Sequence, residues 1–72
     1  MVNSSYIKAM IEDNETKQYV LAKQLGISEN SLSKKISNKR NFSITEMVHL
    51  MELLNIDFNL INVKKYFIKE EA

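Results

Sequence analysis

Apolar residues recur at helical spacing along most of the chain, and polar stretches separate the apolar groups. One group spans residues 6–11, and a second spans residues 20–25. A third consists of Leu32 and Ile36 on an otherwise polar surface. Residues three or four apart lie on the same face of an α-helix, so each group predicts a helix with one buried face.

Two further helices are predicted in the second half of the chain. The fourth helix carries a longer apolar stripe, formed by Ile44, Met47, Val48, Met51 and Leu54. Asn55 closes this helix, and Asp57 is the predicted cap of a fifth helix with Phe58 and Ile61 facing inward. Beyond Asn62, the segment NVKKYFIKE is compatible with a continued helix or with a short strand.

The helix boundaries are predicted from capping residues. Side chains that accept a hydrogen bond from the first free N–H groups favour a helix start. In chain order, the candidates are Ser4 or Ser5, Thr16, Ser28, and Ser43 or Thr45. Gly26 is the single glycine of a chain without proline, and it directly follows Leu25. A left-handed residue ends a helix there at no steric cost, so we predict an all-α fold with a tight turn at Gly26.

Length and composition narrow the function classes. A chain of 72 residues is predicted to form one domain, residues 1–72. No apolar run approaches the roughly 18 residues of a membrane span, and no signal-peptide pattern opens the chain, so we expect a cytoplasmic protein that binds no membrane. His49 is the one histidine, and neither cysteine nor a glycine-rich phosphate loop is present. We therefore expect no enzyme, no catalytic residue, no metal site, no cofactor and no small-molecule substrate.

The net charge of +1 conceals an uneven distribution. Residues 17–40 carry six of the ten Lys and Arg residues and a single acid, Glu29. Exposed lysines are common on solvated helix surfaces, so the charge cluster alone is compatible with a surface that binds no partner. A basic third in a nearly neutral protein nevertheless favours an anionic partner.

The basic third coincides with a candidate helix-turn-helix, residues 17–37. Ala22 lies one helical turn before Gly26 and is predicted to face the third helix, where a larger side chain would push the helices apart. An ordinary helical hairpin that binds nothing could share these features. The coincidence of the turn, the apolar residues around it and the positive charge favours DNA binding.

The segment QYVLAKQLGISENSLSKKISNKRNF, residues 18–42, resembles the helix-turn-helix of the phage Cro and phage repressor proteins, the XRE-like group. The matching residues are Gln18, Leu21, Ala22, Leu25, Gly26, Ile27, Leu32 and Ile36. The resemblance extends over residues 5 to about 62 and implies a compact five-helix repressor-like domain, most like the small Cro-type regulators. The sequence departs from the family pattern at Lys17, Glu29 and Lys35, where the family often has a Thr or Ser cap, Gln and an apolar residue.

The resemblance implies that the third helix lies in the major groove of double-stranded DNA. The implied base-reading residues are Ser28, Glu29, Asn30, Ser33 and Lys34. The implied contacts to the DNA backbone are Lys17, Gln18, Asn38, Lys39 and Arg40. Asn30 suits adenine and Lys34 suits guanine, whereas Glu29 either accepts from a cytosine amino group or is repelled by phosphates.

The implied function is that of a transcriptional regulator, a phage-type repressor that binds a near-palindromic operator as a homodimer. Half-sites would lie about 34 Å apart. Tyr66, Phe67 and Ile68, in the C-terminal segment 63–72, either form the dimer surface or cover the first helix. The alternative is a helix-turn-helix module that acts through a protein partner, as an antitoxin-like or polymerase-interacting regulator.

Overall fold

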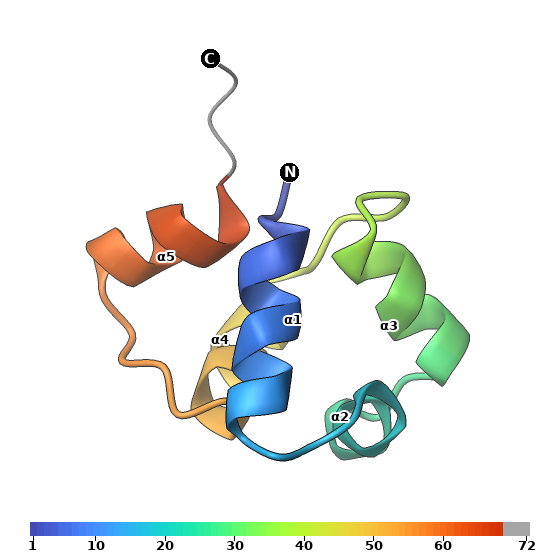
Figure 1. Ribbon diagram of the computed structural model, residues 1–72. Coiled ribbons are helices and arrows are strands. Elements are labelled where there is room, and N and C mark those ends of the chain that lie inside the picture. The colour runs from blue at the N-terminus through green and yellow to red at the C-terminus, as the bar shows by residue number, and fades with distance from the viewer. Residues whose placement is uncertain (69–72) are drawn as a thin grey trace.

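The computed structural model describes residues 1–68, and over these residues it consists of α-helices without a β-strand (Figure 1). The helices are α1 (Ser4–Asp13), α2 (Gln18–Leu25), α3 (Glu29–Ile36), α4 (Ile44–Leu53) and α5 (Leu60–Phe67). The Cα radius of gyration is 11.1 Å, close to the roughly 11 Å of a compact domain of this length. The prediction of a compact all-α fold with five helices is confirmed for the described residues. The last part of the predicted segment 63–72, residues 69–72, lies outside them.

The core lies where α1 meets the other helices. In Figure 1, α1 runs through the middle of the molecule, with α5 on one side and the α2–α3 pair on the other. α2 packs on both α3 and α4, and α5 packs on α1. The buried apolar side chains are Val2, Ile7, Ile11, Leu21, Ala22, Leu32, Ile36, Leu50, Met51, Leu54, Ile56, Tyr66 and Phe67. Each helix therefore buries one face, as the apolar spacing predicts.

A residue with a left-handed backbone follows each of the first four helices. These residues are Glu15 (φ +52°), Gly26 (φ +75°), Asn38 (φ +67°) and Asn55 (φ +57°). At each position the N–H donates to the carbonyl three residues back, and the next N–H donates to the carbonyl five residues back. This is the Schellman motif, which satisfies carbonyls at the end of a helix. The predicted turn at Gly26 and the predicted end of α4 near Asn55 are confirmed.

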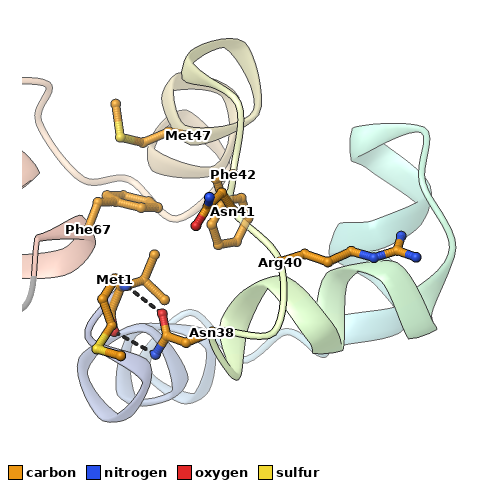
Figure 2. A pocket seen from close by; sticks show the side chains of 8 residues that line it. Met1, Asn38, Arg40, Asn41, Phe42, Met47 and Phe67 are labelled. Atoms are coloured by element: carbon orange, nitrogen blue, oxygen red, sulfur yellow. Dashed lines mark hydrogen bonds between the residues drawn. The ribbon is translucent and has the colours of Figure 1, made fainter.

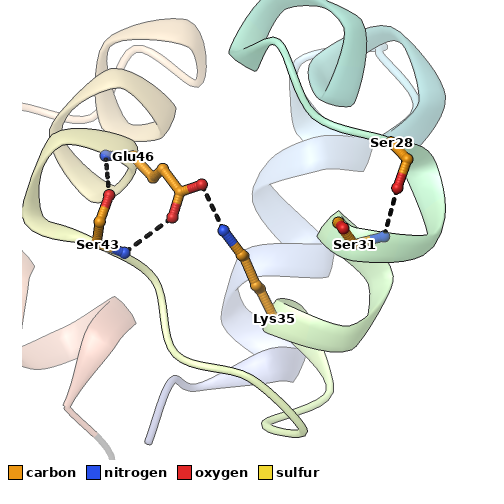
Figure 3. A network of polar contacts seen from close by, with 5 residues as sticks. All are labelled: Ser28, Ser31, Lys35, Ser43 and Glu46. Carbon is orange, nitrogen blue, oxygen red and sulfur yellow. Dashed lines mark hydrogen bonds and ion pairs between the residues drawn. The ribbon is translucent and has the colours of Figure 1, made fainter.

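Serine caps begin the third and fourth helices, as predicted. The Ser28 hydroxyl accepts from the Ser31 N–H at 3.0 Å (Figure 3). The Ser43 hydroxyl accepts from the Glu46 N–H at 3.1 Å, and the Glu46 carboxylate accepts from the Ser43 N–H at 2.9 Å. This reciprocal capping box fixes the start of α4 at a serine, so Thr45 is not its cap.

The predicted caps of the first two helices are wrong. α1 follows Asn3 as its N-cap, and the Ser4 hydroxyl donates to the Ile36 carbonyl at the end of α3. α2 follows Lys17, so Thr16 lies one residue too early. Neither N-cap side chain accepts a hydrogen bond from its helix.

The predicted inward face of α5 is also wrong. The N-cap is Asn59 and not Asp57, because the Asn59 carbonyl oxygen Oδ1 accepts from the Asn62 N–H at 2.8 Å. The helix therefore begins later than predicted. Phe58 and Ile61 consequently point to solvent and are 61% and 78% exposed.

The apolar stripe of α4 is rotated relative to the prediction. Leu50, Met51 and Leu54 are fully buried, whereas Ile44 is 77% exposed and Val48 is half-buried. The buried stripe is centred on the face that carries Leu50 and Leu54. Ile44, in the first turn, lies at its edge and outside the core.

The C-terminal aromatic residues belong to the core. α5 continues to Phe67, so the helical alternative is confirmed for the described part of NVKKYFIKE. The Tyr66 ring meets Tyr6 of α1 edge-on, with 6.3 Å between centroids, and Phe67 meets Phe42 in the same way at 5.6 Å. Tyr66 and Phe67 thus cover the interior of the fold, whereas Ile68 is 48% exposed.

Candidate nucleic-acid interface

One face of α3 is buried and the opposite face is polar and exposed. Leu32 and Ile36 have essentially no solvent contact. Four of the predicted base-reading residues lie along the other face: Glu29, Asn30, Ser33 and Lys34. The first three are exposed, and Lys34 is half-buried. Residues four positions apart share a helix face, so Glu29 lies beside Ser33 and Asn30 beside Lys34. Ser28, the exposed N-cap of α3, directly precedes these residues. The fold therefore places the whole predicted base-reading set along one side of one short helix.

The basic loop, residues 37–41, folds back over the last turn of α3. The N–H groups of Lys39 and Arg40 both donate to the Lys34 carbonyl, at 2.8 and 3.3 Å. Both side chains are exposed, and Figure 2 shows Arg40 extending away from Phe42 and the N-terminal residues. The backbone therefore gathers three cationic residues at the C-terminal end of α3.

Lys17 and Gln18 lie at the start of α2, the helix that packs on α3. Lys17 is exposed and extended, with φ −135° and ψ 157°, and Gln18 is half-buried. The Lys17 side chain accepts no hydrogen bond from the helix. The start of α2 thus has no side-chain cap, although the Val20 N–H donates to the Lys17 carbonyl at 3.1 Å. The positive end of the helix dipole favours an anion there.

Lys35 is withdrawn from the cationic surface. Its ammonium group pairs with the Glu46 carboxylate of α4 (Figure 3), and the two side chains are 14% and 20% exposed. The hydrogen bond from Lys35 and that from the Ser43 N–H hold the pKa of Glu46 below its ordinary value of 4.5. The pair therefore ties α3 to the start of α4.

The spacing Ser43-x-x-Glu46 is a capping-box signal that identifies Glu46 from sequence. No comparable signal identifies Lys35 as its partner, because the pair joins two helices. Lys35–Glu46 is the single ion pair within residues 1–68. Lys34, Lys39 and Arg40 therefore have no acidic partner in the described part of the chain.

Asn38, a predicted phosphate contact, forms hydrogen bonds inside the protein with its side-chain amide. Its Oδ1 accepts from the Val2 N–H at 2.6 Å, and its Nδ2 donates to the Val2 carbonyl at 3.1 Å (Figure 2). Nδ2 also lies 3.4 Å from the Ser4 hydroxyl. The structure gives this amide internal hydrogen bonds, and nothing in the local sequence indicates a partner 36 residues away. The phosphate contact of Asn38 stays a prediction.

Within residues 1–68, no group of three or more His, Cys, Asp or Glu side chains could hold a metal ion. His49 is half-buried on α4 and lines a shallow surface groove with Ile44, Val48 and Glu52. None of the five described helices has the length and apolar character needed to cross a membrane.

Comparisons with curated proteins and with solved structures gave no match. A protein-family model does match, and the match extends from residue 3 to residue 70 and so includes all five helices. The chain therefore belongs to the family described as "Protein of unknown function (DUF739)".

Proposed function

We propose that this protein is a sequence-specific DNA-binding transcriptional regulator. α2, the turn at residues 26–28 and α3 act as a helix-turn-helix, as the resemblance to phage Cro and repressor proteins implies. One observation carries the proposal: the exposed face of α3 is polar along its length and ends beside cations that have no acidic partner within residues 1–68. A helix with that surface matches the groups that DNA presents.

α3 is the reading helix. A helix fits the major groove, which is about 12 Å wide, and presents its outward side chains to base edges. Asn30 pairs with adenine and Lys34 with guanine, since an amide and an ammonium supply the donors and acceptors those bases need. Glu29 accepts from a cytosine amino group, and Ser28 and Ser33 complete the contacts.

Phosphate contacts come from both ends of the reading helix. Lys39 and Arg40 bind the DNA backbone beside the C-terminal end of α3. Lys17 and Gln18 bind it at the start of α2, where the uncapped N–H groups and the helix dipole favour an anion. Phosphate contacts supply most of the affinity and its salt dependence, whereas base contacts select the site.

The protein acts as a homodimer on a near-palindromic operator. α3 has eight residues and is about 12 Å long, so one copy spans only a few base pairs. The large apolar side chains exposed on α4, just before α5 and in the first turn of α5 are Ile44, Phe58, Leu60 and Ile61. These side chains lie outside the DNA-binding face, and burying them against a second copy removes them from water.

Regulation follows from steric exclusion. A dimer on an operator that overlaps a promoter blocks polymerase, so the protein represses without catalysis, metal or cofactor. It acts in the cytoplasm, where its operator is.

The phosphate contacts are tested by fluorescence anisotropy with a labelled duplex of random sequence over a series of salt concentrations. Arg40→Ala should weaken binding and flatten the slope of log K against log salt by about one unit, because one phosphate contact is lost. Lys8→Ala is the matched control, since Lys8 is an exposed cation on α1, outside the basic third. It should leave the slope unchanged.

Equal slopes for the native protein and Arg40→Ala would remove Arg40 from the interface. An equal fall in slope for both variants would mean that binding follows net charge alone and not the proposed face. Failure of the folded native protein to bind DNA at low salt would contradict the proposed function itself.

A further inference from the structure

We propose that Asn38 is a positioning residue for DNA binding, which ties the basic loop to the N-terminal residues and so sets the geometry of Lys39 and Arg40. The proposal rests on the proposed function, because its consequence for binding requires that DNA be the ligand. It assigns to Asn38 an indirect role in place of a direct contact with phosphate.

The N-terminal strap, residues 1–3, lies between the end of α5 and the basic loop. On one side, the Asn3 N–H donates to the Tyr66 carbonyl at 2.8 Å, and Asn3 Nδ2 donates to the Lys65 carbonyl at 3.2 Å. On the other side, both backbone groups of Val2 bind the Asn38 amide. Val2 is buried, so the strap is anchored in the core. The amide clip, which comprises the two Asn38–Val2 hydrogen bonds, therefore connects the loop to a fixed part of the fold.

The left-handed backbone at position 38 does not by itself explain why the residue is asparagine. The left-handed conformation at this position suits glycine best, and asparagine tolerates it. A glycine there would keep the Schellman bonds of α3 but would lose both bonds to Val2. The backbone hydrogen bonds of the Schellman motif are sufficient to end α3. The Asn38 amide adds a connection to Val2, which is distant in the chain.

The connection acts on the two residues that follow. Lys39 and Arg40 are exposed, and their N–H groups share one carbonyl, that of Lys34. Ser37 adds local hydrogen bonds to α3, from its hydroxyl to the Lys34 carbonyl and from its N–H to the Ser33 carbonyl. Asn38 joins the loop to a segment distant in the chain. Loss of the clip would let the loop move away from the end of α3, and the two cationic side chains would then no longer be held where both reach phosphate.

Asn38→Gly is the variant that tests the clip, and Asn55→Gly is its matched control. Asn55 also follows a helix in a left-handed conformation and also uses its amide to reach another segment, with Nδ2 2.9 Å from Asn14 Oδ1. It lies at the opposite end of α4 from the basic loop. A second variant, Val2→Pro, removes the N–H that donates to Asn38 and leaves the loop sequence intact.

Two measurements on the full chain report separately on the order of the loop without DNA and on DNA binding. The first is amide hydrogen exchange of Lys39 and Arg40 without DNA, which should accelerate in Asn38→Gly and in Val2→Pro but not in Asn55→Gly. The second is the salt slope of binding to a random-sequence duplex. Asn38→Gly should lower this slope by about one to two units, because the two cations lose their phosphate contacts.

A direct phosphate contact of the neutral Asn38 amide would instead weaken binding without changing the salt slope, since a neutral group releases no counterions. That result, or unchanged exchange of Lys39 and Arg40 in Asn38→Gly, would overturn the positioning role. A native protein that binds no DNA while the exchange rates change as predicted would overturn the proposed function and leave the clip as a device that orders the loop.

Discussion

At the scale of single residues, backbone strain after the first four helices depends on which residue adopts the left-handed conformation. For a residue other than glycine, this conformation is unfavourable by about 1–2 kcal/mol, and asparagine relieves part of that by local hydrogen bonding. Gly26, Asn38 and Asn55 follow this preference, and Glu15 does not. Glu15 therefore marks the end of α1 as a strained turn.

Glu15→Gly should stabilise the fold by about 1 kcal/mol, which raises Tm by roughly 4–8 °C for a domain of this size. Glu15→Gln is the control, because it removes the charge and keeps the strain. Thermal unfolding followed by circular dichroism measures both. A Tm for Glu15→Gly equal to that of Glu15→Gln would show that the backbone at this turn is not strained.

Gly26→Ala should have the opposite effect and destabilise by about 1–2 kcal/mol. A Cβ added at Gly26 would meet no heavy atom within 4 Å, so the effect would come from the backbone conformation alone. Gly26→Asn should therefore recover part of the loss in the same unfolding experiment. Equal losses for alanine and asparagine would contradict this explanation.

The Lys35–Glu46 pair gives stability a defined pH dependence. Because the folded-state pKa of Glu46 is lowered from its ordinary value of 4.5, its contribution is complete above that value and is lost as pH falls through the folded value. Glu46→Gln should lower the free energy of unfolding at pH 7 by up to about 1 kcal/mol. Urea denaturation at pH 7 and pH 3 should show that the difference from the native protein shrinks in acid. A difference of equal size at both pH values would exclude the ionised pair as its source.

At the scale of elements, α3 is the proposed base-reading helix. Asn30→Ala and Lys34→Ala should each cost about 1–3 kcal/mol at the preferred site and relax the preference at one base position. Lys23→Ala, which removes an exposed cation from α2, is the control and should leave the preference intact. Binding measured against a set of single-base variants of the site distinguishes these cases. An equal loss on every sequence would show that α3 does not read bases.

Periodicity located the helices because it is a local property, and serine caps fixed the starts of α3 and α4 but not those of the other helices. The spacing of Leu32 and Ile36, the cap at Ser28 and the turn at Gly26 together located α3. The start of α5 was misplaced because Asn59 takes the capping role that Asp57 could also have taken.

The remaining differences arise from contacts between distant segments. The pairing of Lys35 with Glu46 and the hydrogen bonds from Asn38 to Val2 depend on how helices pack. No periodic pattern in one sequence encodes such contacts. The exposed face of α3 was therefore predictable, whereas the internal use of two polar residues near it was not.

At the scale of the whole molecule, the distribution of exposed apolar side chains separates two possible dimer surfaces. Ile61→Glu should convert the proposed dimer to a monomer without unfolding the protein, because the side chain is exposed and contributes nothing to the core. Ile68→Glu, at the end of α5, should leave the dimer intact. Sedimentation velocity reports both. Dissociation by Ile68→Glu and not by Ile61→Glu would place the interface at the C-terminal end instead.

Selection of bound duplexes from a random DNA pool tests the central proposal most directly, at about 150 mM salt so that sequence-independent phosphate binding is suppressed. We predict enrichment of an inverted repeat whose halves lie about one helical turn apart. Enrichment of no sequence by a protein that is shown to be folded would contradict sequence-specific DNA binding and would favour action through a protein partner.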